Sequence, residues 1–128
     1  MIDQVRILVV DDDRTARMVL EYALMADGFE VYTAEDGLAG LEIAREKVPD
    51  IILLDWMMPK MNGLEMLSRL RTDEVAKHIP VFMLSSRFQE REIVEAFDKG
   101  IDAYITKPFN IVKLGKTIRR KLLKYGKV

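Results

Sequence analysis

Acidic side chains stand directly after two apolar runs of the sequence. The run RILVV (6–10) leads into Asp11-Asp12-Asp13, and the run IILL (51–54) ends at Asp55. Uninterrupted apolar runs of this length are typical of strands buried on both faces of a parallel sheet. Open α/β sheets place their ligands at the carboxyl ends of such strands. These carboxylates are therefore candidates for chemistry, although an acidic residue after a strand usually caps the next helix, the role that we expect for Asp13.

A hydroxyl pair and a lysine follow two further strand-like runs. The run VFML (81–84) ends at Ser85-Ser86, and AYIT (103–106) is followed by Lys107. Carboxylates that lie close together repel one another, and the pKa of each rises unless a cation is present. Mg²⁺ fits best, because it takes one or two carboxylates, keeps waters and leaves room for a phosphate. A carboxylate nucleophile, Mg²⁺, a lysine and a small hydroxyl together suit phosphoryl transfer to an aspartate.

The rest of the pattern supplies elements that would place these residues side by side. The expected strands span 6–10, 29–34, 51–54, 81–84 and 103–106. The helices between and after them span about 14–26, 38–47, a stretch from Leu64, a stretch ending at Gly100, and about 110–125. This alternation predicts an α/β fold with five helices on both faces of a five-stranded parallel sheet. Right-handed crossovers make the sheet doubly wound and flavodoxin-like, with strand order 2-1-3-4-5.

Each expected helix carries apolar residues at helical spacing, which predicts its buried face. The inward residues are Ala16, Val19, Leu20, Ala23 and Leu24 in the first helix, Leu38, Leu41 and Ala44 in the second, and Leu64, Leu67 and Leu70 in the third. Ile93, Val94 and Phe97 mark the fourth helix, and Ile111, Leu114, Ile118 and Leu122 face inward in the last. Lys113, Lys116, Arg120, Lys124 and Lys127 crowd the outer side of the last helix.

Length, composition and net charge limit the number of domains and the kinds of function that the chain can have. The length of 128 residues predicts one domain over 1–128, with room for a full core. A net charge of -1 does not favour binding to nucleic acid or to an anionic membrane. The sequence has no cysteine, which excludes disulfides, thiolate catalysis and cysteine-based metal sites. No apolar run approaches the length of a membrane span, and we expect a cytoplasmic protein.

Four segments resemble the receiver domain of two-component response regulators, close to the single-domain chemotaxis type. They are ILVVDDDRTAR (7–17), LLDWMMPKMNGLEML (53–67), PVFMLSS (80–86) and DAYITKPF (102–109). The four segments follow the family's order and spacing over nearly the whole chain, so the resemblance is specific.

The resemblance implies a role for each candidate residue. Asp55 would accept a phosphoryl group from a histidine kinase or histidine phosphotransfer protein, with Lys107 as the cation and Ser85 as the hydroxyl. Magnesium would be held by Asp11, Asp12, Asp55 and the backbone carbonyl of Met57. Tyr104 would be an aromatic switch beside Ser85, and the Lys107–Pro108 bond would be cis.

The resemblance also implies what kind of protein this is. It would catalyse only its own phosphorylation and dephosphorylation, and would be a monomer when unphosphorylated. Phosphorylation would switch the binding of a downstream protein, or of an output domain in a longer parent chain, through the surface of the fourth helix, fifth strand and last helix. Ala103 and Thr117 replace an Asp and an Arg that pair across the phospho-dimer of winged-helix regulators, so that dimer is not expected here.

Two other functions fit parts of the sequence. The segment Asp11 to Thr15 matches the DxDxT pattern of haloacid dehalogenase-type phosphohydrolases, in which Asp11 would be the nucleophile. Against this reading, the chain is short and has no cap domain. The position of the phosphoryl group would separate the two, with Asp55 labelled in a receiver and Asp11 in a hydrolase. A flavodoxin-like nucleotide binder is disfavoured, because the first loop offers carboxylates where a phosphate needs donors.

Overall fold

The computed structural model describes residues 4–125 as strands that alternate with helices. The strands are β1 (Arg6–Val10), β2 (Glu30–Ala34), β3 (Ile51–Asp55), β4 (Val81–Ser85) and β5 (Ala103–Thr106). The helices are α1 (Arg14–Ala26), α2 (Gly37–Lys47), α3 (Gly63–Arg71), α4 (Glu90–Lys99) and α5 (Ile111–Leu122), and a 3₁₀ turn, η1 (Leu123–Tyr125), follows α5. No helix within 4–125 is long and apolar enough to cross a lipid bilayer.

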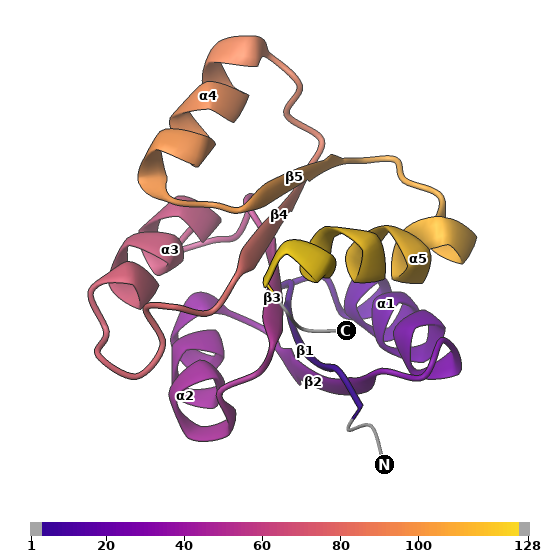
Figure 1. Cartoon of the computed structure of the whole chain (residues 1–128). Helices are drawn as coiled ribbons and strands as arrows, with labels where there is room; N and C mark the ends of the chain where they lie inside the picture. Colours follow the sequence, from indigo (N-terminus) through magenta and orange to yellow (C-terminus); the bar gives the residue numbers. More distant parts are fainter. Residues whose placement is uncertain (1–3, 126–128) are drawn as a thin grey trace.

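The five strands form one parallel sheet in the order β2-β1-β3-β4-β5, which confirms the predicted doubly wound topology. Helices α1 and α5 cover one face, and α2, α3 and α4 cover the other (Figure 1). Side chains alternate between these faces along each strand. Ile7 and Val9 of β1 therefore pack towards α1 and α5, whereas Leu8 and Val10 pack in the second core on the opposite side.

The central strands are buried on both faces, as their apolar runs predict. Every residue of β3 and β4 is buried, including the polar residues Asp55 and Ser85 that end them. These two polar residues occupy the last positions of adjacent strands, at the carboxyl edge of the sheet. The topology thus brings these two candidate site residues to the same edge of the sheet.

Some boundaries and faces differ from the predictions. β2 begins at Glu30 rather than Phe29, although Phe29 is buried in the core. Leu38, predicted to be buried, is 62% exposed, because it lies beside the buried stripe of α2, which consists of the small residues Gly37, Gly40 and Ala44. Val19 of α1, also predicted to be buried, is 50% exposed and lines a surface pocket together with residues of the loop after β5. The last helix ends at Leu122, three residues before its predicted end.

Helices α4 and α5 present contrasting surfaces. Ala96 is the buried residue of α4, while Val94 and Phe97 are about half exposed. In α5 the predicted inward residues Leu114, Ile118 and Leu122 are buried, and Ile111 packs against the same core from a partly exposed position. The predicted outward residues Lys113, Lys116, Arg120 and Lys124 are exposed, and Lys127 lies outside the described residues.

Candidate functional site

Three carboxylates converge at the carboxyl edge of the sheet. Asp11 directly follows β1 and Asp55 ends the neighbouring strand β3, and their exposed fractions are 1% and 6%. Asp11, Asp12 and Asp55 each offer an oxygen within 4.8 Å of the others. Asp13 does not join them, because its carboxylate accepts the Thr15 N–H and caps α1, as predicted. The sheet therefore concentrates negative charge where little water can screen it.

Lys107, which directly follows the edge strand β5, brings a cation to this cluster. Its Nζ lies 3.5 Å from Asp55 Oδ1 and 3.9 Å from Asp11 Oδ2. Its backbone N–H donates to the Ser85 carbonyl. This bond extends the pairing of β5 with β4 and fixes the position of the Lys107 backbone. The Lys107–Pro108 bond is cis, as the resemblance implied.

Ser85 is fully buried at the end of β4, beside Asp55. Its Oγ accepts the Arg87 N–H at 3.0 Å. A hydroxyl can also donate one hydrogen bond. The Ser85 hydroxyl proton remains available for an anion at Asp55 without loss of the bond to Arg87.

Burial raises the pKa of both core carboxylates. For Asp55 burial is the main cause, the nearby Lys107 opposes it, the Asp11 carboxylate adds to it, and the pKa is raised to about 6. The pKa of Asp11 is also raised, again mainly by burial, and the hydrogen bond from the Asp13 N–H opposes this rise. One lysine therefore does not fully compensate the two buried carboxylates.

The donor set fits a hard divalent cation. Asp11 Oδ2 is buried, and no described residue gives it a hydrogen bond. A buried carboxylate oxygen without a donor is costly unless a cation satisfies it. The oxygens of Asp11, Asp12 and Asp55 are the ligand type that Mg²⁺ prefers, with room for water because Asp12 is exposed.

The loop after β3 is held tightly against the end of that strand. Asn62 and Glu65 form a capping box at the start of α3. Gly63 donates its N–H to the Trp56 carbonyl, and a Cβ at Gly63 would lie 2.6 Å from the Asp55 carbonyl oxygen. The Met57 backbone N–H makes a minor contribution that lowers the pKa of the Asp55 carboxylate. A role of the Met57 carbonyl as a metal ligand stays a prediction.

Aromatic and cationic contacts link this loop to the loop between β4 and α4. The rings of Trp56 and Tyr104 meet edge to face, with centroids 6.3 Å apart. The Tyr104 hydroxyl donates to the Arg87 carbonyl at 2.7 Å. The Arg87 guanidinium carbon lies 4.9 Å from the centre of the Trp56 ring, and the guanidinium pairs with Glu92. Sequence reasoning did not find this cluster, because loop-to-loop contacts leave no periodic signal.

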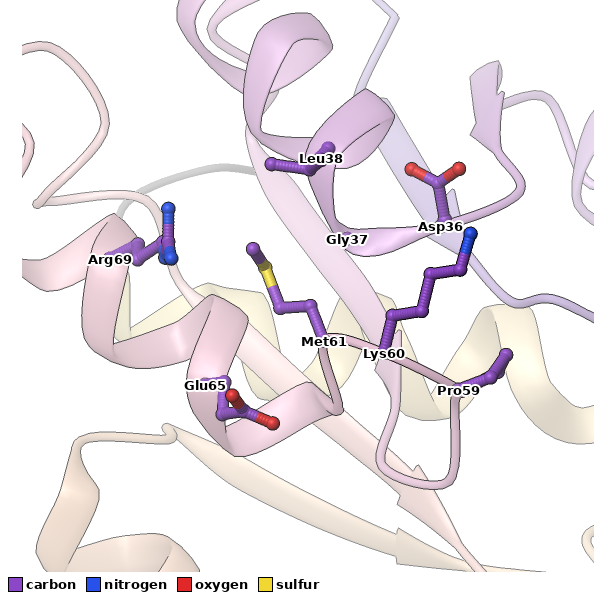
Figure 2. A pocket seen from close by; sticks show the side chains of 8 residues that line it. All are labelled: Asp36, Gly37, Leu38, Pro59, Lys60, Met61, Glu65 and Arg69. Atoms are coloured by element: carbon purple, nitrogen blue, oxygen red, sulfur yellow. The ribbon is translucent and has the colours of Figure 1, made fainter.

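Two surface pockets flank the site. One, of about 330 Å³, is bounded by Asp11 and Lys107 and is otherwise mostly apolar, with Val19 and Phe109 among its walls. The other, of about 510 Å³, lies between the start of α2 and the loop before α3 (Figure 2). Leu38 and Met61 line this second pocket together with charged side chains, and none of the predicted site residues does. Only the first pocket is continuous with the carboxylates.

Most of the predicted site is assembled as expected. Asp11, Asp12, Asp55 and Lys107 come together, and Ser85 ends the strand next to Asp55. Tyr104 connects to Ser85 indirectly, since both hydrogen-bond to the backbone of Arg87. These placements agree with the roles implied by the resemblance, which themselves stay predictions.

Comparisons with known proteins identify the family. Residues 7–119 match the family model described as the response regulator receiver domain. The chain is 40% identical to the transcriptional regulatory protein CseB of Streptomyces coelicolor over 126 residues, which are 98% of this chain and 53% of that regulator. It is 37% identical to the chemotaxis protein CheY-3 of Vibrio cholerae over 85% of both chains.

A solved structure shows the same architecture. The chemotaxis protein CheY4 of Vibrio cholerae superimposes with a TM-score of 0.88 at 32% identity, covering 94% of this chain and all of that one. The chain spans about half the length of the transcriptional regulators that it matches, and most of the length of the chemotaxis protein CheY-3. On these grounds the chain belongs to the response regulator receiver domains, the receivers of two-component signalling.

Proposed function

We propose that the chain, taken as one receiver domain over 1–128, accepts a phosphoryl group on Asp55 from a histidine kinase or histidine phosphotransfer protein. The observation that carries this proposal is the buried Asp55 carboxylate, which ends a central strand with the Lys107 ammonium 3.5 Å away. A haloacid dehalogenase-type hydrolase with Asp11 as nucleophile finds no support in the family and structural matches.

The positions of the side chains support the following transfer step. A carboxylate oxygen of Asp55 attacks the phosphorus of a phosphohistidine, so that a P–O bond forms while the P–N bond breaks and the imidazole leaves. Lys107 contacts the attacking carboxylate, and its charge stabilises the negative charge that gathers on the phosphoryl oxygens. The Ser85 hydroxyl then donates to a phosphoryl oxygen.

The carboxylates suit magnesium as the resident cation. Asp11, Asp12 and Asp55, with the backbone carbonyl of Met57, would hold it. When bound, Mg²⁺ supplies positive charge that offsets the phosphoryl oxygens and the clustered carboxylates. The buried Asp11 Oδ2, which no described residue satisfies, is the observation that supports this assignment.

The apolar pocket beside the site supports docking of the phosphodonor. It is bounded by Asp11 and Lys107, so a protein seated on its apolar walls could bring a histidine to the acceptor. The downstream partner, or an output domain in a longer parent chain, would bind the surface of α4, β5 and α5. Before phosphorylation, the protein would be a cytoplasmic monomer. It would not bind nucleic acid directly.

The acceptor can be tested with a small phosphodonor. The wild-type protein, incubated with acetyl phosphate and Mg²⁺, should carry one acid-labile phosphoryl group at Asp55. Asp55→Asn should abolish the label, whereas Asp98→Asn, which alters an exposed aspartate of α4, should leave it unchanged. Label at Asp11, or full labelling of Asp55→Asn, would contradict the proposal.

The magnesium assignment is tested separately by fluorescence. Mg²⁺ titration should change the emission of Trp56, the only tryptophan, and EDTA should reverse the change.

A further inference from the structure

Arg87, in the loop between β4 and α4, lies against the residues that follow the proposed acceptor. Its guanidinium carbon is 4.9 Å from the centre of the Trp56 ring, and its Nε lies 3.1 Å from Met57 Sδ. Its Nη1 pairs with Glu92 in the first turn of α4. Trp56 and Met57 come directly after Asp55, so this cation lies at the start of the acceptor loop.

The backbone of Arg87 is anchored while part of its guanidinium is unused. Its N–H donates to Ser85 Oγ at 3.0 Å, and its carbonyl accepts the Tyr104 hydroxyl at 2.7 Å. A guanidinium carries five N–H donors. The bonds to Glu92 and Met57 use Nη1 and Nε, and within residues 4–125 Nη2 has no hydrogen-bond partner. The side chain is 37% exposed, so it has room to move about a fixed backbone.

We propose that Arg87 is a phosphoryl-binding residue that exchanges Glu92 for the phosphoryl group on Asp55. The exchange couples the acceptor to the first turn of α4, because Glu92 loses its cation when the phosphoryl group gains it. This inference rests on the proposed function, and it names a second cation for the same site besides Lys107.

The charges favour this exchange. A phosphoryl group carries more negative charge than a carboxylate and binds the planar fork of a guanidinium through two parallel hydrogen bonds. Glu92 offers a single charge, and its position in the first turn of α4 lets the helix dipole stabilise it after Arg87 departs. The Met57 sulfur is a weak acceptor and opposes the movement little. A purely structural pair of Arg87 and Glu92 would instead stabilise the loop equally with and without a phosphoryl group.

The exchange can be measured with beryllofluoride, a phosphoryl mimic, in the presence of Mg²⁺. Affinity is read from Trp56 emission, and the Arg87 Nε–H signal is followed by NMR. Glu92→Gln removes the competing charge and should tighten the mimic about three- to fivefold, the size of a part-exposed ion pair. The matched control is Glu95→Gln, an exposed glutamate of the same helix, which should leave the affinity unchanged.

A second pair of variants shows that the effect passes through Arg87. Arg87→Ala should weaken the mimic and cancel the gain from Glu92→Gln, while Arg87→Lys should fall between Arg87→Ala and the wild type. Equal affinities for Glu92→Gln and Glu95→Gln, or a gain that persists in Arg87→Ala, would overturn the inference and leave Asp55 as the acceptor. Failure of the proposed function looks different, since then the mimic would not bind, or would bind Asp55→Asn equally well.

Discussion

The buried carboxylate of Asp55 carries an energetic cost that the rest of the site must offset. Its pKa is raised to about 6, so between about pH 4 and pH 6 the folded protein keeps a proton that the unfolded chain has released. Stability from this group is therefore lost as pH rises through that window. Above pH 6, burial of the charged Asp55 carboxylate lowers the free energy of unfolding by its full amount. The raised pKa corresponds to up to about 3 kcal/mol.

We therefore predict that Asp55→Asn stabilises the metal-free protein, and more so at high pH. In EDTA, the gain in unfolding free energy should be about 1 kcal/mol near pH 4.5 and reach about 2 to 3 kcal/mol at pH 8. Urea denaturation of both proteins across this range measures it. Asp98→Asn supplies the control for loss of an exposed carboxylate, and a gain independent of pH would contradict the assignment of the cost to Asp55.

Met57 should prolong the life of the phosphoryl group. Its side chain is 52% exposed, two residues after the proposed acceptor Asp55, and cannot orient an attacking water as an amide could. Met57→Asn should shorten the phosphoprotein lifetime by at least about threefold. Acid-labile label is followed after removal of the phosphodonor, with Met25→Asn, a change at a methionine of similar exposure in α1, as the control. An unchanged lifetime in Met57→Asn would count against this role.

At the scale of elements, the first residues of α2 and α3 offer a matched comparison. A Cβ at Gly63 would lie 2.6 Å from the Asp55 carbonyl oxygen and 2.8 Å from the Trp56 Cα, both backbone atoms that cannot move aside. A Cβ at Gly37 would meet only the flexible side chain of Met61. Gly63→Ala should lower the unfolding free energy by about 1 to 3 kcal/mol and slow labelling of Asp55, whereas Gly37→Ala should do neither. Equal denaturation midpoints for the two variants would refute this argument.

The placement of the site by elements could be predicted because parallel strands share a carboxyl edge. Apolar runs that end at Asp55 and Ser85 are enough to bring those two residues to the same edge of the sheet, at the ends of adjacent strands. The exposure of Leu38 could not be predicted, because two glycines, Gly37 and Gly40, contribute to the buried face of α2, and a glycine has no apolar side chain that would mark this face in the sequence. The contacts of Arg87 were missed because a cation–π contact and a sulfur contact between two loops require coordinates.

At the scale of the whole molecule, one chain of contacts leads from the proposed acceptor site to the surface of α4, β5 and α5. Ser85 Oγ accepts the Arg87 N–H, the Arg87 carbonyl accepts the Tyr104 hydroxyl, and the Tyr104 ring meets Trp56. The Ser85 hydroxyl proton can turn to a phosphoryl oxygen on Asp55. A pull on Ser85 would therefore shift the loop at Arg87 and, through it, Tyr104 on β5.

We predict that the Tyr104 hydroxyl carries part of this coupling. Beryllofluoride with Mg²⁺ should change hydrogen exchange of the α4 amides in the wild type, because the loop before α4 moves with Ser85. Tyr104→Phe keeps the ring against Trp56 but loses the bond to the Arg87 carbonyl, so the change in α4 should shrink by at least about half while the mimic still binds Asp55. Tyr32→Phe, at a tyrosine on the distant edge strand β2, is the control for loss of a part-buried hydroxyl bond. If α4 responds equally in Tyr104→Phe and the wild type, the signal reaches this surface without the Tyr104 hydroxyl.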